Sequence, residues 1–563
     1  MTTSNADQTQ PVLARRRFLA GIGGAAASAI ALPRVVGAQS EQPSEQPAAE
    51  PVVINLELDE IQGNVLPGFN NHHQAMVFVR FPSATAGREW LATVSAAVAP
   101  ASEVAAHPGV SNTTWVNLAL SYPGLVALGR STSELRRFPV EFRAGLVKRA
   151  NTVGDVGHNA AANWPAPFRQ VAHAMLIVAA DSTDDRREVV QQQQQIATQH
   201  GVEVVHVEYG DARADEPGHE HFGFRDGISQ PGVRGFTEPR NPADPQQGQP
   251  GQDLLWPGEF VLGYPAQAGP GGGEEAGPLA TSGPEWTKNG SYLVFRRLRQ
   301  DVAGFRAFVQ SVAQQQQLSE DLAGAKIVGR FKSGAPLAIT GEQDIDPGLR
   351  NPALLADDVV NDFEFADDDL NGDVVPLAAH IRKTYPRDHP TDDGGEEDTQ
   401  RHRMLRRGIP FGASLAANAT IDSAAATADF PNDRGLLFLC YQTSIARQFE
   451  HVQQQWVNDP TFPEPNTGQD AVIATSPGSG EFALPGGRTG HVALMQRFVT
   501  TTGGDYFFAP SRSAITMLSS APPAPVPPTA QPPTAQPPAT RPQRPARRGR
   551  GNQPPPRRRS QQP

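Results

Sequence analysis

Short apolar runs alternate with helix-like segments in the first half of the chain. Four runs are typical of strands: 74–81 (QAMVFVRF), 114–120 (TWVNLAL), 173–180 (HAMLIVAA) and 202–209 (VEVVHVEY). Residues 88–98 and 184–199 have a helix-like pattern and lie between the two strands of each pair. The order strand, helix, strand, repeated once, predicts a unit of the ferredoxin-like type.

A second alternation of strand and helix follows in the other half of the chain. Its strands are expected at 291–298 (SYLVFRRL), 436–442 (LLFLCYQ) and 491–499, and its helices at 301–317 and 445–456. A long insertion, roughly 340–430, separates its two halves and is rich in aspartate, proline and glycine. Long insertions in compact domains are often functional, so this one is a candidate location for a functional site.

The N-terminus has the pattern of an export signal. Residues 14–20 (ARRRFLA) are basic, a short apolar segment follows, and small residues precede Gln39. Arg15 and Arg16, closely followed by phenylalanine and leucine, resemble a twin-arginine signal. The apolar segment is too short and too rich in glycine for a membrane span. We therefore expect a soluble mature chain that begins near Gln39 and is periplasmic or extracellular.

The C-terminus has a different composition. Residues 521–563 contain 15 prolines, eight arginines and no acidic residue, so they cannot bury enough apolar surface to fold. The whole chain carries a net charge of −11, this tail +8 and residues 1–38 +3, which leaves −22 on residues 39–520. The basic tail is suited to anionic surfaces or to its own acidic body, and a spacer role also explains it. Nothing in it indicates a specific nucleic acid.

The length and the cysteine content of the chain limit the number of domains and the kind of fold that it can have. A length of 563 residues is consistent with two or three domains, and a single cysteine, Cys440, excludes an intramolecular disulfide framework. We expect five segments: a signal peptide (1–38), a linker (39–54), an N-terminal ferredoxin-like unit ending in the GFRDG motif (55–235), a C-terminal ferredoxin-like unit with the long insertion (236–520) and a disordered tail (521–563).

Three motifs carry the candidate chemistry: GFRDGISQP at 223–231, AHIRKTYPR at 379–387 and MLRRGIPFG at 404–412. Each is weak alone, because glycine-flanked aspartates occur in many turns and isolated histidines are often structural. In this order, however, the motifs resemble those of the dye-decolourising peroxidases, a family of haem enzymes. The resemblance covers roughly 55–515 and includes IQGNVLPG at 61–68.

The resemblance implies an α+β fold, with two ferredoxin-like units and antiparallel sheets of the dimeric α+β barrel type. The haem would be held mainly by the second unit. One haem b per chain is implied, with His380 matching the proximal ligand of the iron. Arg406, rather than its neighbour Arg407, matches the distal arginine, and Asp226 matches the distal acid–base residue.

Further positions are implied in the same way. They are Gly227, Ile228 and Ser229 along the haem edge, Tyr385, Pro386 and Arg387 packed on the haem, Leu436 and Phe438 in an apolar distal wall, and Asp470 as a partner of His380. Relatives commonly carry cysteine and asparagine where this chain has Val375 and Tyr385. Neither departure removes a ligand.

The implied activity is reduction of hydrogen peroxide through compound I, coupled to oxidation of a bulky organic reductant such as a dye, a phenolic or a lignin-like compound. A carboxylate can accept a proton from peroxide and return it, and a guanidinium can stabilise the departing oxygen. Family members pass electrons from surface tryptophan or tyrosine. The six tryptophans are therefore candidates: Trp90, Trp115, Trp164, Trp256, Trp286 and Trp456.

Other interpretations stay open from the sequence. An exported haem protein could handle haem or iron without efficient turnover, and turnover with peroxide distinguishes the two activities. Cys440 could bind haem as a thiolate, although its neighbours offer no cation that would lower the thiol pKa. His219 and His221 could hold a metal but supply only two ligands, fewer than zinc sites need. A homo-oligomer is compatible with the sequence.

The double substitution Arg15→Lys/Arg16→Lys is expected to keep the chain inside the producing cell, because the signal is identified by its arginine pair. The wild-type chain should be exported with an N-terminus near Gln39, which intact-mass analysis of the exported fraction measures. Export of the double variant at the wild-type level would contradict the assignment.

Overall fold

The computed structural model describes residues 54–109, 112–241, 246–273, 275–344, 360–391, 394–420, 430–475, 480–484, 490–494 and 496–522. The expected signal peptide, almost all of the linker and nearly the whole tail lie outside these ranges, so their assignments stay predictions. Within the ranges, no helix combines the length and the apolar character needed to cross a bilayer.

The first unit has the predicted order of elements. They are β1 (His73–Arg80), α1 (Ala84–Ser95), β2 (Thr114–Ser121), β3 (Ala174–Ala180), α7 (Thr183–Gln199) and β4 (Glu203–Asp211). The strands pair antiparallel in the order β2-β3-β1-β4, which is the ferredoxin-like arrangement. Short helices occupy the connections: α2 (Ala101–Ala105), α3 (Tyr122–Ala127), α4 (Thr132–Leu135), α5 (Val140–Ala144) and α6 (Ala150–Val153).

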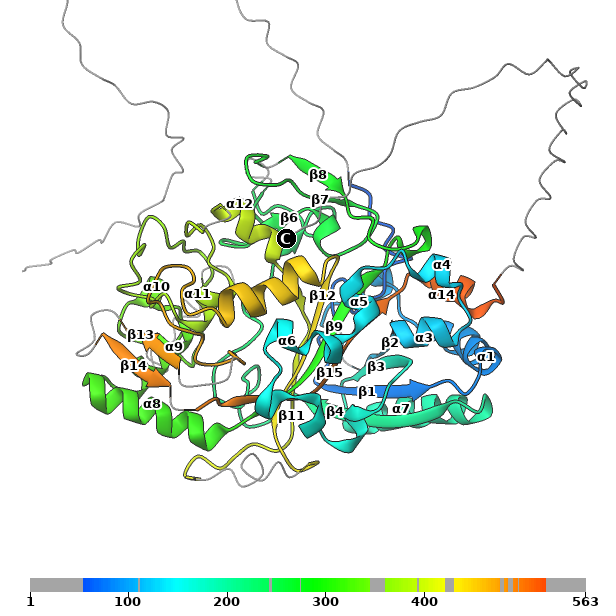
Figure 1. Cartoon of the computed structure of the whole chain (residues 1–563), viewed down its shortest axis with the longest axis horizontal. Helices are drawn as coiled ribbons and strands as arrows, with labels where there is room; N and C mark the ends of the chain where they lie inside the picture. Colours follow the sequence, from blue (N-terminus) through cyan, green and yellow to red (C-terminus); the bar gives the residue numbers. More distant parts are fainter. Residues whose placement is uncertain are drawn as a thin grey trace, which may run out of the picture. The chain divides into compact units, whose positions relative to one another are not determined.

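Local signals explain where the long helix α7 begins and which way it faces. The hydroxyl of Ser182 accepts a hydrogen bond from the backbone N–H of Asp185 at 3.0 Å, which is an N-cap interaction. Asp184 and Asp185 lie in the first turn, where negative charge is favourable. The buried residues of α7, among them Val190 and Ala197, pack against the sheet of the first unit (Figure 1).

The second unit repeats the arrangement. It contains β9 (Ser291–Gln300), α8 (Val302–Gln316), β10 (Leu405–Arg406), β11 (Ile409–Phe411), β12 (Gly435–Gln442), the π-helical turns η8 (Ala446–Glu450) and η9 (Val452–Val457), and β15 (Val499–Ala509). The strands pair antiparallel in the order β10-β12-β9-β15, with β11 also on β12. The predicted fold class, α+β with two ferredoxin-like units, is therefore confirmed.

The closing strand of the second unit was wrongly expected at 491–499. Strand β15 begins only at Val499, whereas β14 (His491–Leu494) pairs with β13 (Gly480–Ala483) in a separate small sheet. The register of β15 on β9 shifts between Thr501 and Gly503. This bulge and the adjacent glycine interrupt the alternation by which a strand is found in a sequence.

Remaining elements lie around the two units. They are β5 (Gly232–Val233), β6 (Leu254–Leu255), β7 (Pro265–Gln267), β8 (Ala276–Leu279), α9 (Glu320–Val328), α10 (Leu337–Thr340), α11 (His380–Thr384), α12 (Glu396–Thr399) and α14 (Arg512–Ser519). The first of the three sequence motifs, GFRDG, lies in the loop that follows β4. Helix α11 carries the histidine of the second motif, and β10 carries the arginine of the third.

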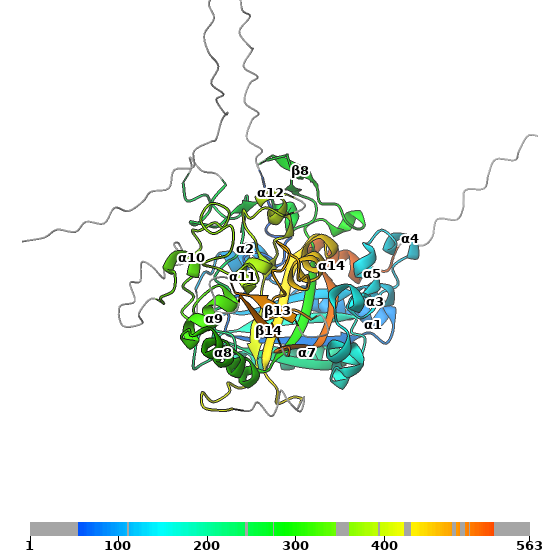
Figure 2. The same cartoon turned by 60° about the vertical axis from the view of Figure 1, so that its left-hand side comes forward.

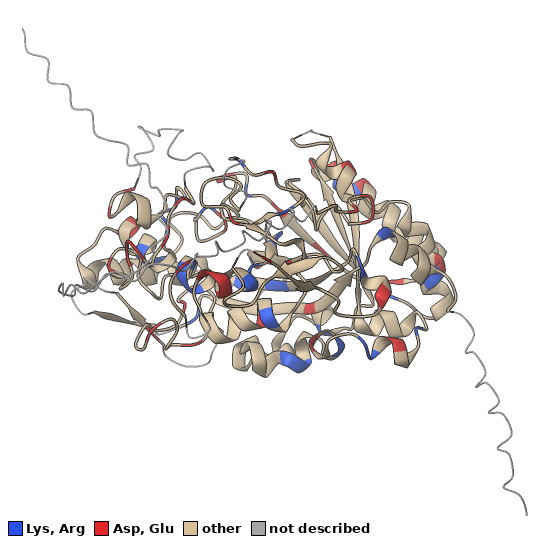
Figure 3. Cartoon of the chain, turned by 90° about the horizontal axis from the view of Figure 1, so that it is seen from above, with Lys and Arg blue, Asp and Glu red and all other residues tan. Residues whose placement is uncertain are grey.

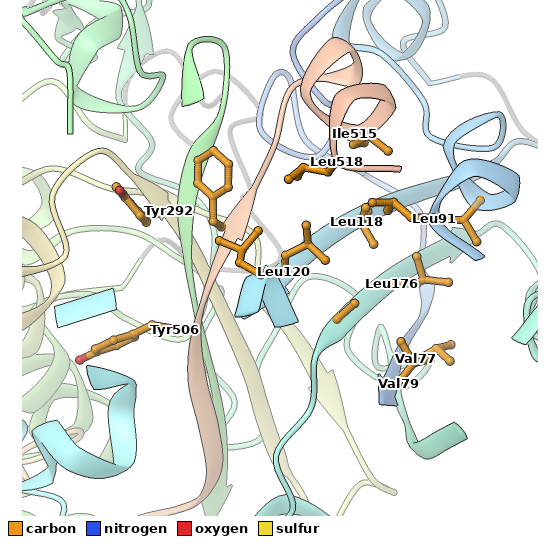
Figure 4. Packing of buried hydrophobic residues seen from close by; sticks show 14 of the residues in the cluster. Val77, Val79, Leu91, Leu118, Leu120, Leu176, Tyr292, Tyr506, Ile515 and Leu518 are labelled. Carbon is orange, nitrogen blue, oxygen red and sulfur yellow. The ribbon is translucent and has the colours of Figure 1, made fainter. Parts of the chain in front are cut away.

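One nine-stranded sheet joins the two units (Figure 1 and Figure 2). The join is the short pairing of β15 with β2, where Phe507 lies opposite Ser121 and Phe508 opposite Leu120. Apolar side chains of both units share one buried cluster, including Leu118, Leu176, Tyr292, Tyr506 and Leu518 (Figure 4). Burial of such side chains is the main favourable term in folding, so the two units stabilise each other.

Charged residues lie mainly on helices and loops, and most strand residues are uncharged (Figure 3). Arg297 of β9 is an exception, since its side chain is 1% exposed. Its guanidinium donates to Glu208 of β4 at 3.0 Å and to both carboxylate oxygens of Asp433 at 2.7 and 2.8 Å. This buried ion pair therefore connects a strand of the second unit with a strand of the first.

The substitution Arg297→Met is expected to lower the free energy of unfolding by about 3–5 kcal/mol, because it leaves two buried carboxylates without their cation. Chemical denaturation of the variant and the wild type measures the change. Arg187→Met is the matched control, since the Arg187–Asp184 pair is 62% and 84% exposed and should contribute little. Equal unfolding midpoints for Arg297→Met and wild type would refute the structural role.

Candidate active site

A cavity of about 470 Å³ lies where the three motifs meet, and both units line it. Among its lining residues are Asp226, Gly227, Ile228, Ser229, His380, Tyr385, Arg387, Arg406, Leu436 and Phe438. The structure thus brings ten of the twelve sequence-expected site residues to one cavity. Of the other two, Pro386 follows Tyr385 in the sequence and is buried. The carboxylate of Asp470 contacts Nδ1 of His380.

A tight turn presents the carboxylate of Asp226. The backbone N–H of Asp226 donates to the carbonyl of Gly218 at 3.0 Å, and the N–H of Gly227 donates to the Asp226 carboxylate at 2.6 Å. Gly227 has φ +75°, a conformation that favours glycine. The side chain of Asp226 stays 39% exposed. The turn therefore holds an accessible carboxylate at the cavity.

Arg406 reaches this carboxylate from β10. Its Nη1 lies 3.4 Å from Oδ1 of Asp226, and its Nη2 donates to the carbonyl of Ser229 at 2.8 Å. Gln230 joins the turn to β10, because its side-chain amide makes hydrogen bonds of 3.0 and 3.2 Å with the backbone of Arg406. Arg407 points elsewhere and donates to the backbone carbonyls of Asn64 and Val65.

His380 at the start of α11 is held by a buried carboxylate. Its Nδ1 lies 2.7 Å from Oδ2 of Asp470, whose side chain is 0% exposed. Burial lowers the pKa of His380, but the charge and hydrogen bond of Asp470 outweigh burial and hold that pKa above its usual value. The family resemblance implies Asp470 as a partner of His380, and in the structure the two side chains are in direct contact.

Three histidines line the cavity, and their ring nitrogens differ in availability. His219 contacts a backbone carbonyl with each of its two nitrogens. His402 contacts a backbone carbonyl with Nδ1 and Asp398 with Nε2. Nε2 of His380 has no hydrogen-bond partner among the residues that the structure describes. His380 is therefore the cavity histidine best prepared to bind a metal ion.

Positive charge gathers on one part of the cavity wall. Arg330 is 6% exposed, and burial, together with the charges of Arg387, Arg406 and Arg225, lowers its pKa to about 9. Arg387 donates to two backbone carbonyls and stacks over the ring of Phe363 at 3.9 Å. Such a wall suits a ligand that carries carboxylates. Sequence reasoning missed Arg330, because no motif marked it.

Tyr385 is fixed by two residues that sequence reasoning also missed. Its hydroxyl donates a hydrogen bond to Asp253, and the guanidinium of Arg403 lies 3.6 Å from its ring centroid. Arg403 in turn binds Asp253 at 3.0 Å. Burial raises the pKa of Tyr385 well above its usual value, so the phenol stays neutral. Tyr385, which stands where relatives commonly carry asparagine, is therefore held by contacts with Asp253 and Arg403.

The site has the features that an iron porphyrin requires. Leu436 and Phe438 would supply apolar surface to the porphyrin, Arg330 and Arg387 could pair with its anionic propionates, and Nε2 of His380, which has no partner among the described residues, would bind the iron. The other candidate ligands fit less well. Burial raises the pKa of Cys440, which keeps its thiol protonated. The described residues contain no group of three or more metal-ligating side chains, and Nε2 of His221 binds the carbonyl of Phe411.

Comparison with known families gives two matches along the chain. Residues 60–214 match the DyP dimeric alpha+beta barrel domain, and residues 272–489 match the Dyp-type peroxidase C-terminal domain. Together they cover more than half of the chain. The matched ranges include Arg406, His380 and Asp470, whereas Asp226 lies between them.

Comparison with individual proteins gives the same result. The chain is 34% identical to dye-decolorizing peroxidase msp1 of Mycetinis scorodonius over 84% of this chain and 90% of the relative. It is 30% identical to the multifunctional dye peroxidase DyP2 of an Amycolatopsis species over 82% and 96%. It superposes on the solved structure of an ancestral D-type dye decolorizing peroxidase with a TM-score of 0.70 and 33% identity, over 83% and 100%.

The substitution His380→Ala is expected to abolish ligation of haem through histidine, because the remaining cavity histidines have both ring nitrogens engaged. Titration of the protein with haem, followed by absorption and magnetic circular dichroism spectra, measures the ligand. His219→Ala and His402→Ala serve as controls and should keep the wild-type spectrum. A histidine-ligated spectrum in His380→Ala would refute the assignment.

Proposed function

The chain belongs to the dye-decolourising peroxidase family, and we propose on that basis that it is a haem b peroxidase in which His380 holds the iron and Asp226 moves the proton. Family membership makes it a peroxidase and implies a haem cofactor. The roles of individual residues are the proposal. Their main support is that one cavity contains both the Asp226–Arg406 pair and a histidine whose Nε2 has no hydrogen-bond partner in the part of the chain that the structure describes.

His380 would bind the iron through Nε2, and bound haem would supply the electrons that peroxide needs. Asp470 fixes Nδ1 of His380 as the hydrogen-bond donor and so directs Nε2 toward the cavity. The carboxylate of Asp470 also makes the imidazole a stronger ligand. Arg330 and Arg387 are placed to bind the propionates.

Asp226 would accept a proton from one oxygen of hydrogen peroxide and return it to the other, so that water leaves. This is general acid–base catalysis, which requires a carboxylate within reach of both oxygens. Arg406 stays charged and stabilises negative charge on the departing oxygen. Oδ1 of Asp226 accepts from Gly227 and contacts Arg406, whereas Oδ2 has no hydrogen-bond partner among the described residues and would take up the proton.

The organic reductant we propose is a dye, a phenolic or a lignin-like compound, oxidised outside the cavity. Of the six tryptophans, Trp90, Trp164, Trp256 and Trp456 are buried, and Trp115 and Trp286 are partly exposed. The partly exposed pair is therefore the better candidate for contact with a bulky reductant. Export by the twin-arginine route, a tail that contacts anionic surfaces and a homo-oligomer belong to the same proposal.

The substitution Asp226→Ala is expected to slow the reaction with peroxide by about two to four powers of ten, the usual contribution of a positioned acid–base group. Stopped-flow absorbance of the haem-loaded protein mixed with peroxide measures the rate. Asp184→Ala is the control, because that carboxylate is 84% exposed on α7.

A wild-type rate in Asp226→Ala would assign the proton transfer to Arg406 or to water. A wild-type protein that binds haem through His380, yet neither reacts with peroxide nor oxidises a dye, would favour a haem- or iron-handling role.

A further inference from the structure

Lys383 lies three residues after His380 on α11, and its side chain has no exposed surface. Lysine is almost never fully buried unless its charge is paired or hydrogen-bonded. Residues three apart on a helix lie on neighbouring positions of its surface. Lys383 is thus a buried basic group next to the proposed ligand of the iron, and burial lowers its pKa to about 7.

The ammonium group of Lys383 is bound by three backbone carbonyls. Nζ donates to the carbonyl oxygens of Asp459 at 2.7 Å, Phe462 at 2.6 Å and Gly468 at 3.0 Å. A lysine ammonium has three N–H donors, so all three are satisfied. The segment that supplies the carbonyls, 459–468, contains no helix or strand of its own. Lys383 therefore supplies hydrogen bonds that fix an otherwise irregular segment.

The same segment leads directly to the partner of His380. Asp470 follows Gly468 by two residues, and its carboxylate binds Nδ1 of His380 at 2.7 Å. Helix α11 is therefore attached to one stretch of chain at two points, through His380 and through Lys383. These two contacts close a ring of covalent and hydrogen bonds that runs through Gly468 and Asp470. Movement of the segment at Lys383 would change the direction of the Asp470 carboxylate.

We propose that Lys383 is a positioning residue that sets the direction of the Asp470 carboxylate and thereby the strength of His380 as an iron ligand. The inference deepens the proposed function and rests on it for the role of His380. Lys383 itself does not line the cavity. A purely structural lysine would stabilise the fold without changing the hydrogen bond between His380 and Asp470.

Vibrational spectroscopy of the haem-loaded protein tests this role. A carboxylate that accepts the Nδ1 proton strengthens the iron–imidazole bond, so a weaker hydrogen bond should lower the iron–histidine stretching frequency. It should also make the reduction potential of the haem more positive, because a weaker donor stabilises the oxidised iron less. Resonance Raman spectra of the reduced protein and a redox titration measure these two quantities.

Asp470→Asn defines the direction of both changes, because it replaces the charged acceptor by a neutral one. Lys383→Met, which removes the three hydrogen bonds, is expected to shift the frequency and the potential in the same direction as Asp470→Asn. Lys326→Met is the matched control. Lys326 is a buried lysine on α9 whose nearest acceptors lie at 3.5 and 3.8 Å, and its loss should leave both quantities at their wild-type values.

Wild-type frequency and potential in Lys383→Met would overturn the inference, as would equal shifts in both methionine variants. If Lys383→Met does not fold, Lys383→Arg replaces it. Arginine keeps the charge but presents a planar fork in place of the compact ammonium. A shift in the same direction supports the inference, and wild-type values contradict it. A wild-type protein without an iron–histidine band would instead contradict the proposed function itself.

Discussion

The candidate site depends on one buried carboxylate, that of Asp470. It accepts hydrogen bonds from the backbone N–H groups of Val472 at 2.7 Å and Ile473 at 2.8 Å, and it contacts Nδ1 of His380 at 2.7 Å. Burial raises the pKa of Asp470, but His380 and the two backbone donors outweigh burial and lower it below the usual value. A buried charge needs such partners. Because Nδ1 of His380 is engaged by Asp470, Nε2 is the nitrogen of this ring that remains without a partner among the described residues.

The fold was largely predictable, because its strands are short apolar runs whose alternation survives in both units. The prediction failed where that alternation is interrupted. In β15 (Val499–Ala509) a bulge and two glycines interrupt the alternation, so the pattern at 491–499 predicts a closing strand where the structure has none. The pairing of β15 with β2 could not be inferred, because Phe507 and Ser121 lie far apart in the sequence. That pairing makes one sheet of the two units.

The site was predictable only as far as its motifs extend. The motifs identified Asp226, His380 and Arg406, and the structure brings these residues to one cavity. Lys383 lies inside a motif, but its side chain donates hydrogen bonds to backbone carbonyl groups about 80 residues away in the sequence. Arg330 lies outside every motif. Contacts of this kind leave no periodic signal in a sequence, because backbone carbonyls and buried charges are paired by the tertiary fold.

A crystal structure of the haem-loaded protein would show directly which side chain binds the iron. We expect a haem in the cavity that both units line, with its iron bound by Nε2 of His380. Asp226 and Arg406 should then face the iron from the opposite side, and the propionates should lie against Arg330 and Arg387. Iron bound by any other side chain, or a haem outside this cavity, would contradict the account.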